Sequence, residues 1–597
     1  QIRGFGTRAA FGIREIRVIL DGLPETLPDG QTELSDVDLE SIARIEVLRG
    51  PASSLYGNAS GGVIQLFTED PPDVPTVESR TLAGSYGLLK TSLKGGAVAG
   101  DVGAFVQGSY FSIAGFRDHA AAYDGTLNAK LRWTPGDATR VTLLANAFDG
   151  PLAQDPGGLT WQQAHANPRQ ARDLNVALDA GEATQQGRVG AVIEHRTGPH
   201  ALSAYAYMLY RDFDSRQPIL PRSGDGAVAF HRTSPGGGLR YDLTQPLAGL
   251  AQTLTVGLDA QGQDDVRRRW ANDAGARGAL GTSERETVQG IGVYVREALF
   301  VTDDVQISGG VRYDDVAFAV DVAYPRGEGD GSRTFGRWSP AGGVLWTALP
   351  WLSAYVNVGT AFQVPTTTEL ANPDGAGLNA AIAPQGSTTW EIGARAGRPD
   401  ELSAGIAAYV LDVDDELVPY EAPSGRTAFR NAGSSRRYGV ELDAQARLTP
   451  WLGTVGGGDV DWTASFTAID ARYVRYATPG GTFDGNDEPG IPPWQAYQQI
   501  AWRRPEGAFV ALEAFFVGGY FVDDANDARA RGYPLVNLRF GLERDVGPVR
   551  VSPFVGVQNL ADASYAATVR LNALGGRFYE PAPGINVYGG VTIAARL

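Results

Sequence analysis

The stretch that decides the fold is Ile45-Glu46-Val47-Leu48-Arg49-Gly50-Pro51, which is followed by Ser54-Leu55-Tyr56-Gly57 and Gly61-Gly62-Val63-Ile64. A single glycine-rich segment near the start of a chain would be weak evidence for any fold. Here, the rest of the sequence has the pattern of strands separated by turns and loops. We therefore expect a small N-terminal unit followed by one very large β-structure.

Composition favours a β-rich chain. Of the 597 residues, 77 are glycine and 10% are aromatic, and both are spread along the whole sequence. Long stretches rich in Ala, Leu, Glu and Lys, which would indicate helices, are missing. No run approaches the roughly 18 to 20 apolar residues of a membrane-spanning helix, but a membrane-spanning strand needs only about 9 to 11 residues with one apolar face.

Charge and cysteine content exclude some classes of function. The chain has no cysteine, so a disulfide framework and a thiolate metal site are excluded. Its formal net charge of −17 argues against nucleic acid as a partner. An anionic ligand stays possible, because a local cluster of arginines can override the overall charge.

Polar and apolar residues alternate in many segments after residue 77. Three examples are residues 254–261, 438–448 and 585–597. Such alternation fits a strand with one lipid-facing and one water-facing side. A soluble β-sandwich shows the same alternation, but its strands average about 5 to 6 residues, and several runs here are about twice as long. The length favours a membrane-spanning antiparallel β-barrel over a sandwich.

Short and long connectors alternate between these segments. We expect tight turns at residues 133–137, 349–351 and 448–451. We expect long loops where Gly, Asp, Asn and Pro are frequent, at residues 149–173, 211–228, 264–284, 372–386 and 470–491. An antiparallel barrel with an even number of strands has short turns at one end and long loops at the other.

The first unit is predicted to span residues 1–72. Strands are expected at residues 17–20 and 61–67, with a mixed pattern at residues 42–48. The segment Glu69-Asp70-Pro71-Pro72-Asp73-Val74-Pro75 breaks strand pairing, because proline donates no backbone hydrogen bond. We place the linker there and assign residues 73–597 to the barrel.

The stretch around Ile45 resembles the plug-domain signature of TonB-dependent outer-membrane transporters. The segments Arg3-Gly4, Thr389-Trp390-Glu391-Ile392-Gly393 and Arg437-Tyr438-Gly439-Val440-Glu441 resemble further motifs of this family. The resemblance implies an all-β transmembrane protein of the bacterial outer membrane, with a 22-stranded antiparallel barrel and the plug domain inside its lumen. The number 22 comes from the family alone. In this reading the short turns face the periplasm and the long loops face the outside.

The family resemblance also implies partners. These are the TonB–ExbB–ExbD energy-transducing complex, outer-membrane lipid and lipopolysaccharide, and a small-molecule substrate taken up by a monomer. The segment that binds TonB precedes the plug in this family. Because the chain begins with Gln1 and residues 1–13 lack an apolar signal-peptide region, we expect the plug to be N-terminally incomplete and the TonB box to be absent.

Four charged residues are expected to hold the plug in the barrel. In the family, two plug arginines face two barrel glutamates, and the matching positions are Arg3, Arg49, Glu391 and Glu441. Buried charges require partners, and arginine offers a planar fork to carboxylates. The alternative for each residue is a solvated charge in the lumen.

No catalytic or metal site is expected, and no cofactor. The five histidines, His119, His165, His195, His200 and His231, lack the i, i+4 spacing of a helical metal site. There is no G-x-S-x-G nucleophile motif. A Ser-His-Asp site stays an open alternative, since outer-membrane barrels include phospholipases, but we predict that the chain is not an enzyme.

The ligand site of the family lies at the plug apex beneath the outer loops. The apex loops are expected at residues 6–14 and 25–33, where Arg8, Arg14, Asp29 and Gln31 are the candidate substrate-binding residues. Arginine suits carboxylates, which it binds through two parallel hydrogen bonds.

Several segments are similar to the branch of the family that transports pyrroloquinoline quinone. They are Gly4-Phe5-Gly6-Thr7-Arg8, Asp21-Gly22-Leu23-Pro24, Pro28-Asp29-Gly30-Gln31, Gly115-Phe116-Arg117-Asp118-His119, Asp155-Pro156-Gly157-Gly158-Leu159-Thr160 and Asn167-Pro168-Arg169-Gln170. This planar tricarboxylate would require arginines at its rim and an aromatic ring for stacking. The candidates in the loops are Arg117, Arg169, Arg211, Arg216, Arg222 and the run Arg267-Arg268-Arg269-Trp270. The alternatives are a ferric siderophore or ferric citrate and, from another class, a passive pore or surface receptor.

Overall fold

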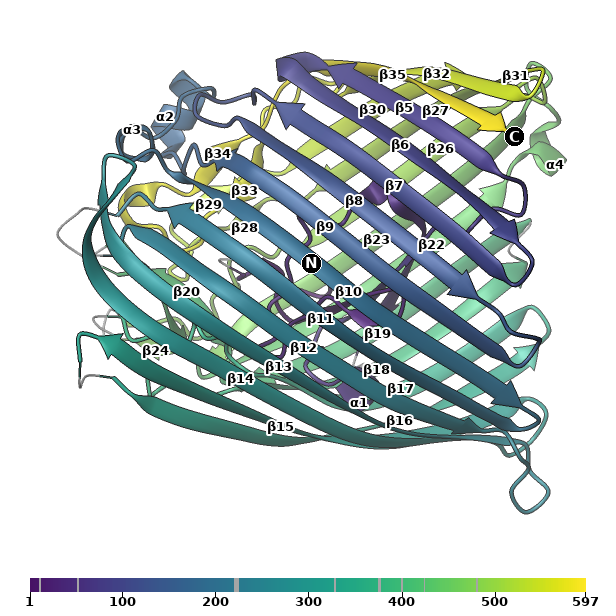
Figure 1. The fold of residues 1–597 in the computed structure, drawn as a ribbon, viewed down its shortest axis with the longest axis horizontal. Helices are drawn as coiled ribbons and strands as arrows, with labels where there is room; N and C mark the ends of the chain where they lie inside the picture. The colour runs from purple at the N-terminus through teal and green to yellow at the C-terminus, as the bar shows by residue number, and fades with distance from the viewer. Residues whose placement is uncertain are drawn as a thin grey trace.

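The computed structural model describes residues 1–597 apart from residues 10–11, 51–52, 220–224, 327–328, 374–376, 399–400, 423–424 and 479–480. Most of the chain forms a closed antiparallel barrel of 22 strands (Figure 1). The last strand, β35 (Asn586–Arg596), pairs with the first, β5 (Thr76–Gly84), to close it. The predicted fold class is therefore confirmed. Among the described residues, no helix has the length and apolar character needed to cross a membrane.

Each barrel strand pairs with its neighbours in chain order. β30 and β31 both pair with β32 and are two pieces of one strand interrupted at Glu543. The strands between β5 and β35 are β6 (Leu88–Ala99), β7 (Val102–Ile113), β8 (Ala122–Trp133), β9 (Thr139–Gln154), β10 (Gly181–Thr197), β11 (His200–Arg216), β12 (Ala227–Leu243), β13 (Gln252–Asp273), β14 (Ala276–Phe300), β15 (Val305–Tyr324), β16 (Gly331–Leu349), β17 (Leu352–Gln363), β18 (Gln385–Arg398), β19 (Leu402–Asp414), β22 (Ser434–Arg447), β23 (Asp459–Arg475), β26 (Trp494–Arg503), β27 (Ala508–Val517), β30 (Tyr533–Leu542), β31 (Arg544–Val546) and β32 (Val549–Gln558).

The two faces of the strands differ as the alternation predicts. On the predicted strand at residues 438–448, Val440 and Leu442 are exposed on the outside of the barrel. Their neighbours Arg437 and Glu441 are buried in the lumen. The apolar face therefore points towards lipid and the polar face points inwards, which is the reverse of a soluble sandwich.

The connectors differ in length between the two ends. The three predicted turns separate β8 from β9, β16 from β17 and β22 from β23, all at one end. The first two are short, whereas the third is not tight, because residues 448–458 join β22 to β23 and include a short helix. At the other end, three residues join β5 to β6 and two join β13 to β14, but most loops are longer and several contain small helices or hairpins. These are η2 (Ser85–Gly87), α2 (Trp161–Ala166), α3 (Asp173–Ala177), β20 (Leu417–Glu421), β21 (Thr427–Asn431), β24 (Ala477–Thr478), β25 (Gly481–Thr482), β28 (Tyr520–Phe521), β29 (Arg529–Ala530), β33 (Ala566–Val569), η4 (Leu574–Gly576) and β34 (Tyr579–Pro581), while α4 (Thr449–Leu452) lies in a turn at the opposite end.

One predicted loop is wrong. Residues 264–284, expected to form a long loop, belong instead to a tall hairpin in which β13 and β14 continue to a turn at Ala274 and Gly275. Charged residues are frequent there because they pair across the two strands in a wet environment, as Arg285 does with Asp264. The charge-rich composition that suggested a loop is equally compatible with paired strands.

Tyrosine and phenylalanine rings cover glycines on the neighbouring strand. Tyr355 lies opposite Gly393, Tyr409 opposite Gly439 and Tyr294 opposite Gly257. A methyl group added at any of these glycines would come within 2.4 Å of the ring. Many of the glycines that are frequent in the sequence therefore provide space for aromatic rings.

The plug is a four-stranded sheet inside the barrel (Figure 1). Its strands, in the order β2-β1-β4-β3, are β2 (Leu23–Pro24), β1 (Ile16–Leu20), β4 (Gly62–Thr68) and β3 (Ile42–Arg49), accompanied by η1 (Leu39–Ser41) and α1 (Ser53–Tyr56). β1 and β4 are parallel, whereas β3 and β4 are antiparallel. The plug sheet ends at Thr68 and the first barrel strand starts at Thr76, and the predicted boundary at residue 72 falls in this interval.

Candidate functional site

Arg3 of the plug binds two glutamates of the barrel wall. Its Nε and Nη2 atoms donate to the two carboxylate oxygens of Glu441, each at 3.0 Å, and Nη1 donates to Glu391 at 2.5 Å. All three side chains are buried. The Tyr355 hydroxyl donates to Glu391 at 2.6 Å, and the Arg3 guanidinium lies 4.2 Å from the Tyr409 ring centre.

Arg49 reaches the same cluster from β3. Its Nη1 atom lies 3.1 Å from Glu441, and Nη2 lies 3.6 Å from Asp443 on the same strand. The structure thus brings the four predicted residues together. Sequence reasoning missed Asp443, although its position two residues after Glu441 places it on the same face of β22. That this cluster holds the plug during function stays a prediction.

Arg14 lies at the plug apex and is held by a loop. Its Nε and Nη2 atoms donate to the two oxygens of Glu369 at 3.1 and 2.8 Å. Nη2 also donates to the carbonyl of Val364, and Nη1 to the carbonyl of Asp29. Glu369 belongs to the loop between β17 and β18, so the plug apex and this loop are joined by a two-pronged ion pair.

Arg8 enters a second buried cluster with two loop glutamates. Its Nη2 atom donates to the Tyr473 hydroxyl at 3.0 Å and to Glu488 at 3.2 Å, and Nη1 lies 3.5 Å from Glu416. Arg437 of β22 lies 2.5 Å from Glu416 and 2.7 Å from Glu488. Two guanidinium groups therefore balance two carboxylates.

The two glutamates of this cluster differ in proton affinity. Burial, followed by the negative charge of Glu488, raises the pKa of Glu416 to about 7. Burial would also raise the pKa of Glu488, but the charges of Arg437 and Arg8 outweigh it and lower that pKa to about 2. One carboxylate is thus firmly charged while the other titrates near neutral pH.

The two other candidate residues of the apex loops, Asp29 and Gln31, differ in burial. Asp29 is fully buried, and its Oδ1 atom accepts a hydrogen bond from the backbone of Gln31 at 3.1 Å. Its Oδ2 atom has no hydrogen-bond partner in the described part of the chain. Gln31 is half-buried. Asp29 therefore shapes the turn of its loop.

The loop arginines proposed as ligand contacts have separate partners. Arg117 donates to the carbonyls of Gln170 and Pro156, and Arg169 lies over the Phe116 ring. Arg211 lies in the β11 wall and donates to Gln186. Arg216 pairs with Asp179. Arg222 lies outside the described residues.

The predicted loop run at residues 267–270 lies in strand β13. Arg267 and Arg269 pair with Glu286 and Glu284 across the hairpin, and Arg268 is exposed. The prediction that residues 267–270 lie in a loop is wrong, because strand β13 continues through them. Their charges stabilise the tall hairpin.

The outer loops meet over the barrel mouth. Arg577 lies 2.9 Å from Glu421, which joins the loop after β32 to the loop after β19. Arg570 lies 3.0 Å from Asp155, which joins the loop after β32 to the loop after β9. These loops start at different strands of the barrel, so their contacts join separate parts of the barrel mouth.

No metal site is visible in the part of the chain that the structure describes. No group of three or more His, Asp or Glu side chains there is arranged to hold a metal ion. The five histidines are separated, and His119, for example, contacts the Ala180 carbonyl at 2.8 Å. The predictions of no metal, no cofactor and no catalytic residues stay predictions.

Two family models match the chain. The model of the TonB-dependent receptor-like β-barrel matches residues 109–560, and that of the TonB-dependent receptor plug domain matches residues 1–63. Among relatives, the pesticin receptor of Yersinia enterocolitica is 23% identical over 95% of this chain and 82% of its own length. The vitamin B12 transporter of Photobacterium profundum is 26% identical over 85% of this chain and 74% of its own length.

Solved structures share the fold. The unliganded ferric citrate transporter has a TM-score of 0.82 at 19% identity, covering 100% of this chain and 92% of that one. The ferric yersiniabactin uptake receptor of Yersinia pestis has a TM-score of 0.78 at 16% identity, covering 100% and 90%. With a barrel, an internal plug and both family models matched, the chain belongs to the TonB-dependent receptor family: it is an uptake receptor of the bacterial outer membrane and not an enzyme.

Proposed function

We propose that this receptor takes up a scarce anionic small molecule that carries carboxylates, with pyrroloquinoline quinone as the first candidate. The proposal rests on the ion pairs that the two apex arginines, Arg8 and Arg14, form with carboxylates of the protein. Arg14 and Arg8 each lie at the interface of plug and outer loops, and each binds a carboxylate of the protein itself. A ligand carboxylate placed there would find the same two-pronged donor.

Aromatic rings beside Arg8 supply the second requirement of a planar ligand. Tyr473 and Tyr476 have ring centres 4.7 Å apart, and the Arg8 guanidinium lies 5.3 Å from the Tyr473 ring centre. Rings of this kind stack on flat conjugated ligands. In the closed arrangement these rings are buried, so ligand entry requires the outer loops to move.

Uptake then needs an exchange of partners and a source of energy. The ligand replaces Glu369 at Arg14, or Glu416 and Glu488 at Arg8, and the loops close over it. TonB coupling, which the family implies, draws on the proton-motive force of the inner membrane to displace the plug. We further propose that the receptor is a monomer surrounded by lipid and lipopolysaccharide and holds no resident cofactor.

A ferric siderophore or ferric citrate is the second candidate. Ferrioxamine B and pesticin receptors are among the relatives of similar length, and ferric citrate also presents carboxylates to arginine. A passive pore or surface receptor is a third alternative. It is disfavoured because the plug occupies the lumen and joins the wall through buried ion pairs on several strands.

A titration of the purified receptor separates the candidates. Pyrroloquinoline quinone and ferric citrate are added separately while calorimetry and tryptophan fluorescence report binding. We expect one of them to bind below micromolar concentration, and Arg8→Ala or Arg14→Ala to weaken it by about 10- to 100-fold, since a hydrogen bond to a charged group contributes about 1.5 to 3 kcal/mol.

The matched control is Arg44→Ala. Arg44 is an exposed plug arginine whose partner, Glu46, lies on the same strand, so binding should be unchanged. If neither anion binds, the substrate proposal fails. Uptake that persists when the proton-motive force is collapsed by a protonophore would favour the passive pore.

A further inference from the structure

Most charged contacts of the plug with the barrel are divided by sign between its two sides; Glu15, which accepts a hydrogen bond from Gln385 of β18 at 2.8 Å, is an exception. Seven of its carboxylates bind side chains of strands β5 to β10, and four of its arginines bind carboxylates of β18, β22 and the adjoining outer loops. The carboxylates are Asp21, Glu25, Asp36, Asp38, Glu40, Glu69 and Asp70, and the arginines are Arg3, Arg8, Arg14 and Arg49. We call these sides the acidic face and the basic face of the plug.

The barrel wall has the complementary pattern. The wall of β5 to β10 contributes cations, amides and the Ser92 hydroxyl to these contacts. The opposite wall contributes mainly carboxylates, together with Arg437, which donates to the Arg3 carbonyl. The two walls are separated by β11 to β17 in one direction and by β26 to β35 in the other. An anion passing one wall meets attraction, whereas an anion passing the other meets repulsion.

Lysines mark the cationic wall. The sequence contains three lysines, Lys90, Lys94 and Lys130. They lie 2.7 Å from Asp38, 2.7 Å from Glu69 and 3.1 Å from Asp21. Every lysine of the chain therefore stands in the lumen against the acidic face, and we call strands β5 to β10 the lysine wall.

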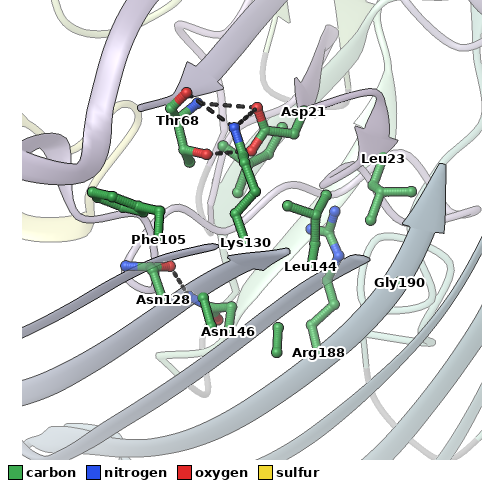
Figure 2. A pocket seen from close by; sticks show the side chains of 13 residues that line it. Asp21, Leu23, Thr68, Phe105, Asn128, Lys130, Leu144, Asn146, Arg188 and Gly190 are labelled. Carbon is green, nitrogen blue, oxygen red and sulfur yellow. Dashed lines mark hydrogen bonds and ion pairs between the residues drawn. The ribbon is translucent and has the colours of Figure 1, made fainter. Parts of the chain in front are cut away.

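The contact between the acidic face and the lysine wall contains a small cavity. Its volume is about 30 Å³, and Figure 2 shows Asp21 and Leu23 of the plug on one side with Lys130 and Arg188 of the wall on the other. Such a volume holds about one water molecule. Asn146 lines it, and the Oδ1 atom of Asn146 has no partner among the described residues. Leu23, Phe105 and Leu144 also line the cavity, so plug and wall meet here through a mixture of polar and apolar groups around a gap.

Arg211 of the adjoining strand β11 forms no ion pair with a described plug carboxylate. Arg211 of β11 is buried in the lumen, and its hydrogen bond goes to the neutral Gln186. Among the described residues, no carboxylate lies within ion-pair distance of Arg211. Gln186 in turn donates to Asp36 of the acidic face. Arg211 therefore extends the cationic wall and contacts the plug only indirectly, through Gln186, without a direct ion pair in the described part of the chain.

We propose that the anionic ligand crosses the barrel between the acidic face of the plug and the lysine wall. This proposal rests on the proposed function, uptake of an anion. When the acidic face withdraws, Lys90, Lys130 and Arg188 lose their carboxylates, and the ligand replaces them in succession. Charged side chains that line a passage select ions of the opposite sign. Withdrawal of the basic face would instead expose Glu391 and Glu441 to the ligand.

Reversible disulfides between plug and barrel can identify the side on which the plug separates from the wall. Leu23 of the plug contacts Gly190 of β10, because a Cβ atom at Gly190 would come within 2.3 Å of Leu23 Cδ1, and cysteines at these two positions are therefore chosen to tether the plug to the lysine wall. The control tether joins Pro28 to Gly290 of β14, where the two Cβ atoms would lie 3.7 Å apart, within the range of roughly 3.5 to 4.5 Å found in disulfides. The chain has no cysteine of its own, so each double variant can form only the intended disulfide within the chain, and mass spectrometry establishes that it has formed.

Uptake of pyrroloquinoline quinone, or of the ferric chelate that binds in the titration, is measured in cells before and after reduction. The L23C/G190C tether should slow uptake by about tenfold or more and reduction should restore it, whereas the P28C/G290C tether should change it by less than about twofold. Uptake that continues through the first tether overturns the path. Equal inhibition by both tethers also overturns it, because the plug then leaves as one body.

A charge variant tests the wall itself. Arg211→Gln should lower the uptake rate several-fold while the dissociation constant of the extracellular ligand stays the same. The matched control is Glu513→Gln on β27, whose carboxylate contacts only Gln499 among the described residues. A changed dissociation constant, or equal effects of both variants, would contradict the path. If the untethered receptor takes up neither anion, the proposed function itself fails, and that result is distinct from uptake that ignores the tether.

Discussion

At the scale of single residues, an uncharged glycine supports the charged cluster around Arg3. Gly393 lies opposite Tyr355, and the Tyr355 hydroxyl donates to Glu391, which binds Arg3. The ring can lie flat over β18 only because position 393 has no side chain. The orientation of Glu391 therefore depends on the absence of a side chain at Gly393, two residues further along β18.

We expect Gly393→Ala to destabilise the receptor. The new methyl group would lie 2.4 Å from the Tyr355 ring, and such overpacking costs about 1 to 3 kcal/mol. The shift also moves the Tyr355 hydroxyl away from Glu391. Urea denaturation followed by tyrosine fluorescence measures the loss. Gly187→Ala is the control, since no atom lies within 4 Å of a Cβ atom there; equal stability of the two variants would contradict the argument.

The apex cluster predicts a pH dependence of loop closure. Glu416 has a pKa of about 7 in the closed loops because of burial and then the charge of Glu488, and about 4.3 when exposed to water. The closed state thus binds a proton that the open state releases between about pH 4 and 7, so closure weakens as pH rises through this window. Glu488, with a pKa of about 2, stays charged throughout.

Hydrogen exchange of residues 415–433 at pH 5.5 and pH 8 measures this effect. Exchange should be faster at pH 8 after correction for the intrinsic rate. In Glu416→Gln the difference should vanish, because the amide does not titrate. A variant that keeps the full pH dependence would show that another group is responsible.

At the scale of elements, the loop between β17 and β18 is anchored by apolar packing. Leu370 and Ile382 of this loop are buried against Phe362 and Val364 at the end of β17 and against Phe318 of the wall. Packing of this kind fixes the loop, and the loop carries Glu369 to Arg14. An apolar cluster thereby positions a charged contact.

Leu370→Ala should loosen this loop without altering the barrel. Truncation of a fully buried leucine costs about 2 to 5 kcal/mol, and Val364 and Ile382, which are also buried in this loop, belong to the same cluster. Limited proteolysis should cut the loop between residues 364 and 384 sooner in the variant. Leu574→Ala, at an exposed leucine of another outer loop, should not change the cleavage rate; a faster cut there would indicate general loosening.

At the scale of the whole molecule, plug and barrel are held by different forces. The barrel is a closed ring of paired strands without a free edge, whereas the plug joins the wall through ion pairs and amides. All eleven tryptophans lie in the barrel, and all three lysines lie at the plug–barrel contact. Tryptophan emission therefore reports the barrel, and lysine reactivity reports the seating of the plug.

We expect two separate transitions in urea. Lysine acylation, followed by mass spectrometry, should rise at a lower urea concentration than the shift in tryptophan emission. The reason is that a continuous ladder of backbone hydrogen bonds closes the barrel, while the plug contact depends on side chains. Coincident transitions would mean that plug and barrel unfold as one cooperative unit.

Much of this architecture follows from local patterns in the sequence. Alternation over long segments predicts strands with an outer apolar face, and the prolines after Glu69 fall in the interval where plug gives way to barrel. The positions of Arg3, Arg49, Glu391 and Glu441 follow from motifs, and the structure brings them together. Such features depend on neighbours in sequence or on a fixed strand period.

Contacts between distant loops could not be predicted. Nothing near Arg8 or Arg14 in the sequence indicates that Glu488 and Glu369 bind them, because loop conformation depends on the whole barrel mouth. The hairpin of β13 and β14 was mistaken for a loop because charged residues in a wet lumen resemble loop residues. The division of plug charge between two sides was not predicted. The carboxylates that bind the lysine wall lie at residues 21–40 and 69–70, but which wall they meet depends on the position of each strand.

The separation of charge on the plug also bears on assembly. Because the barrel strands are similar to one another, the plug could be inserted in many orientations about the barrel axis, and shape alone distinguishes these orientations poorly. Turning this plug by half a revolution would bring Asp38 and Asp21 towards Glu391 and Glu441, and Arg3 towards Lys90 and Lys130. Because like charges would then meet in a poorly hydrated space, that orientation is strongly disfavoured. The complementary charges of plug and wall therefore favour a single orientation of the plug when the barrel closes around it.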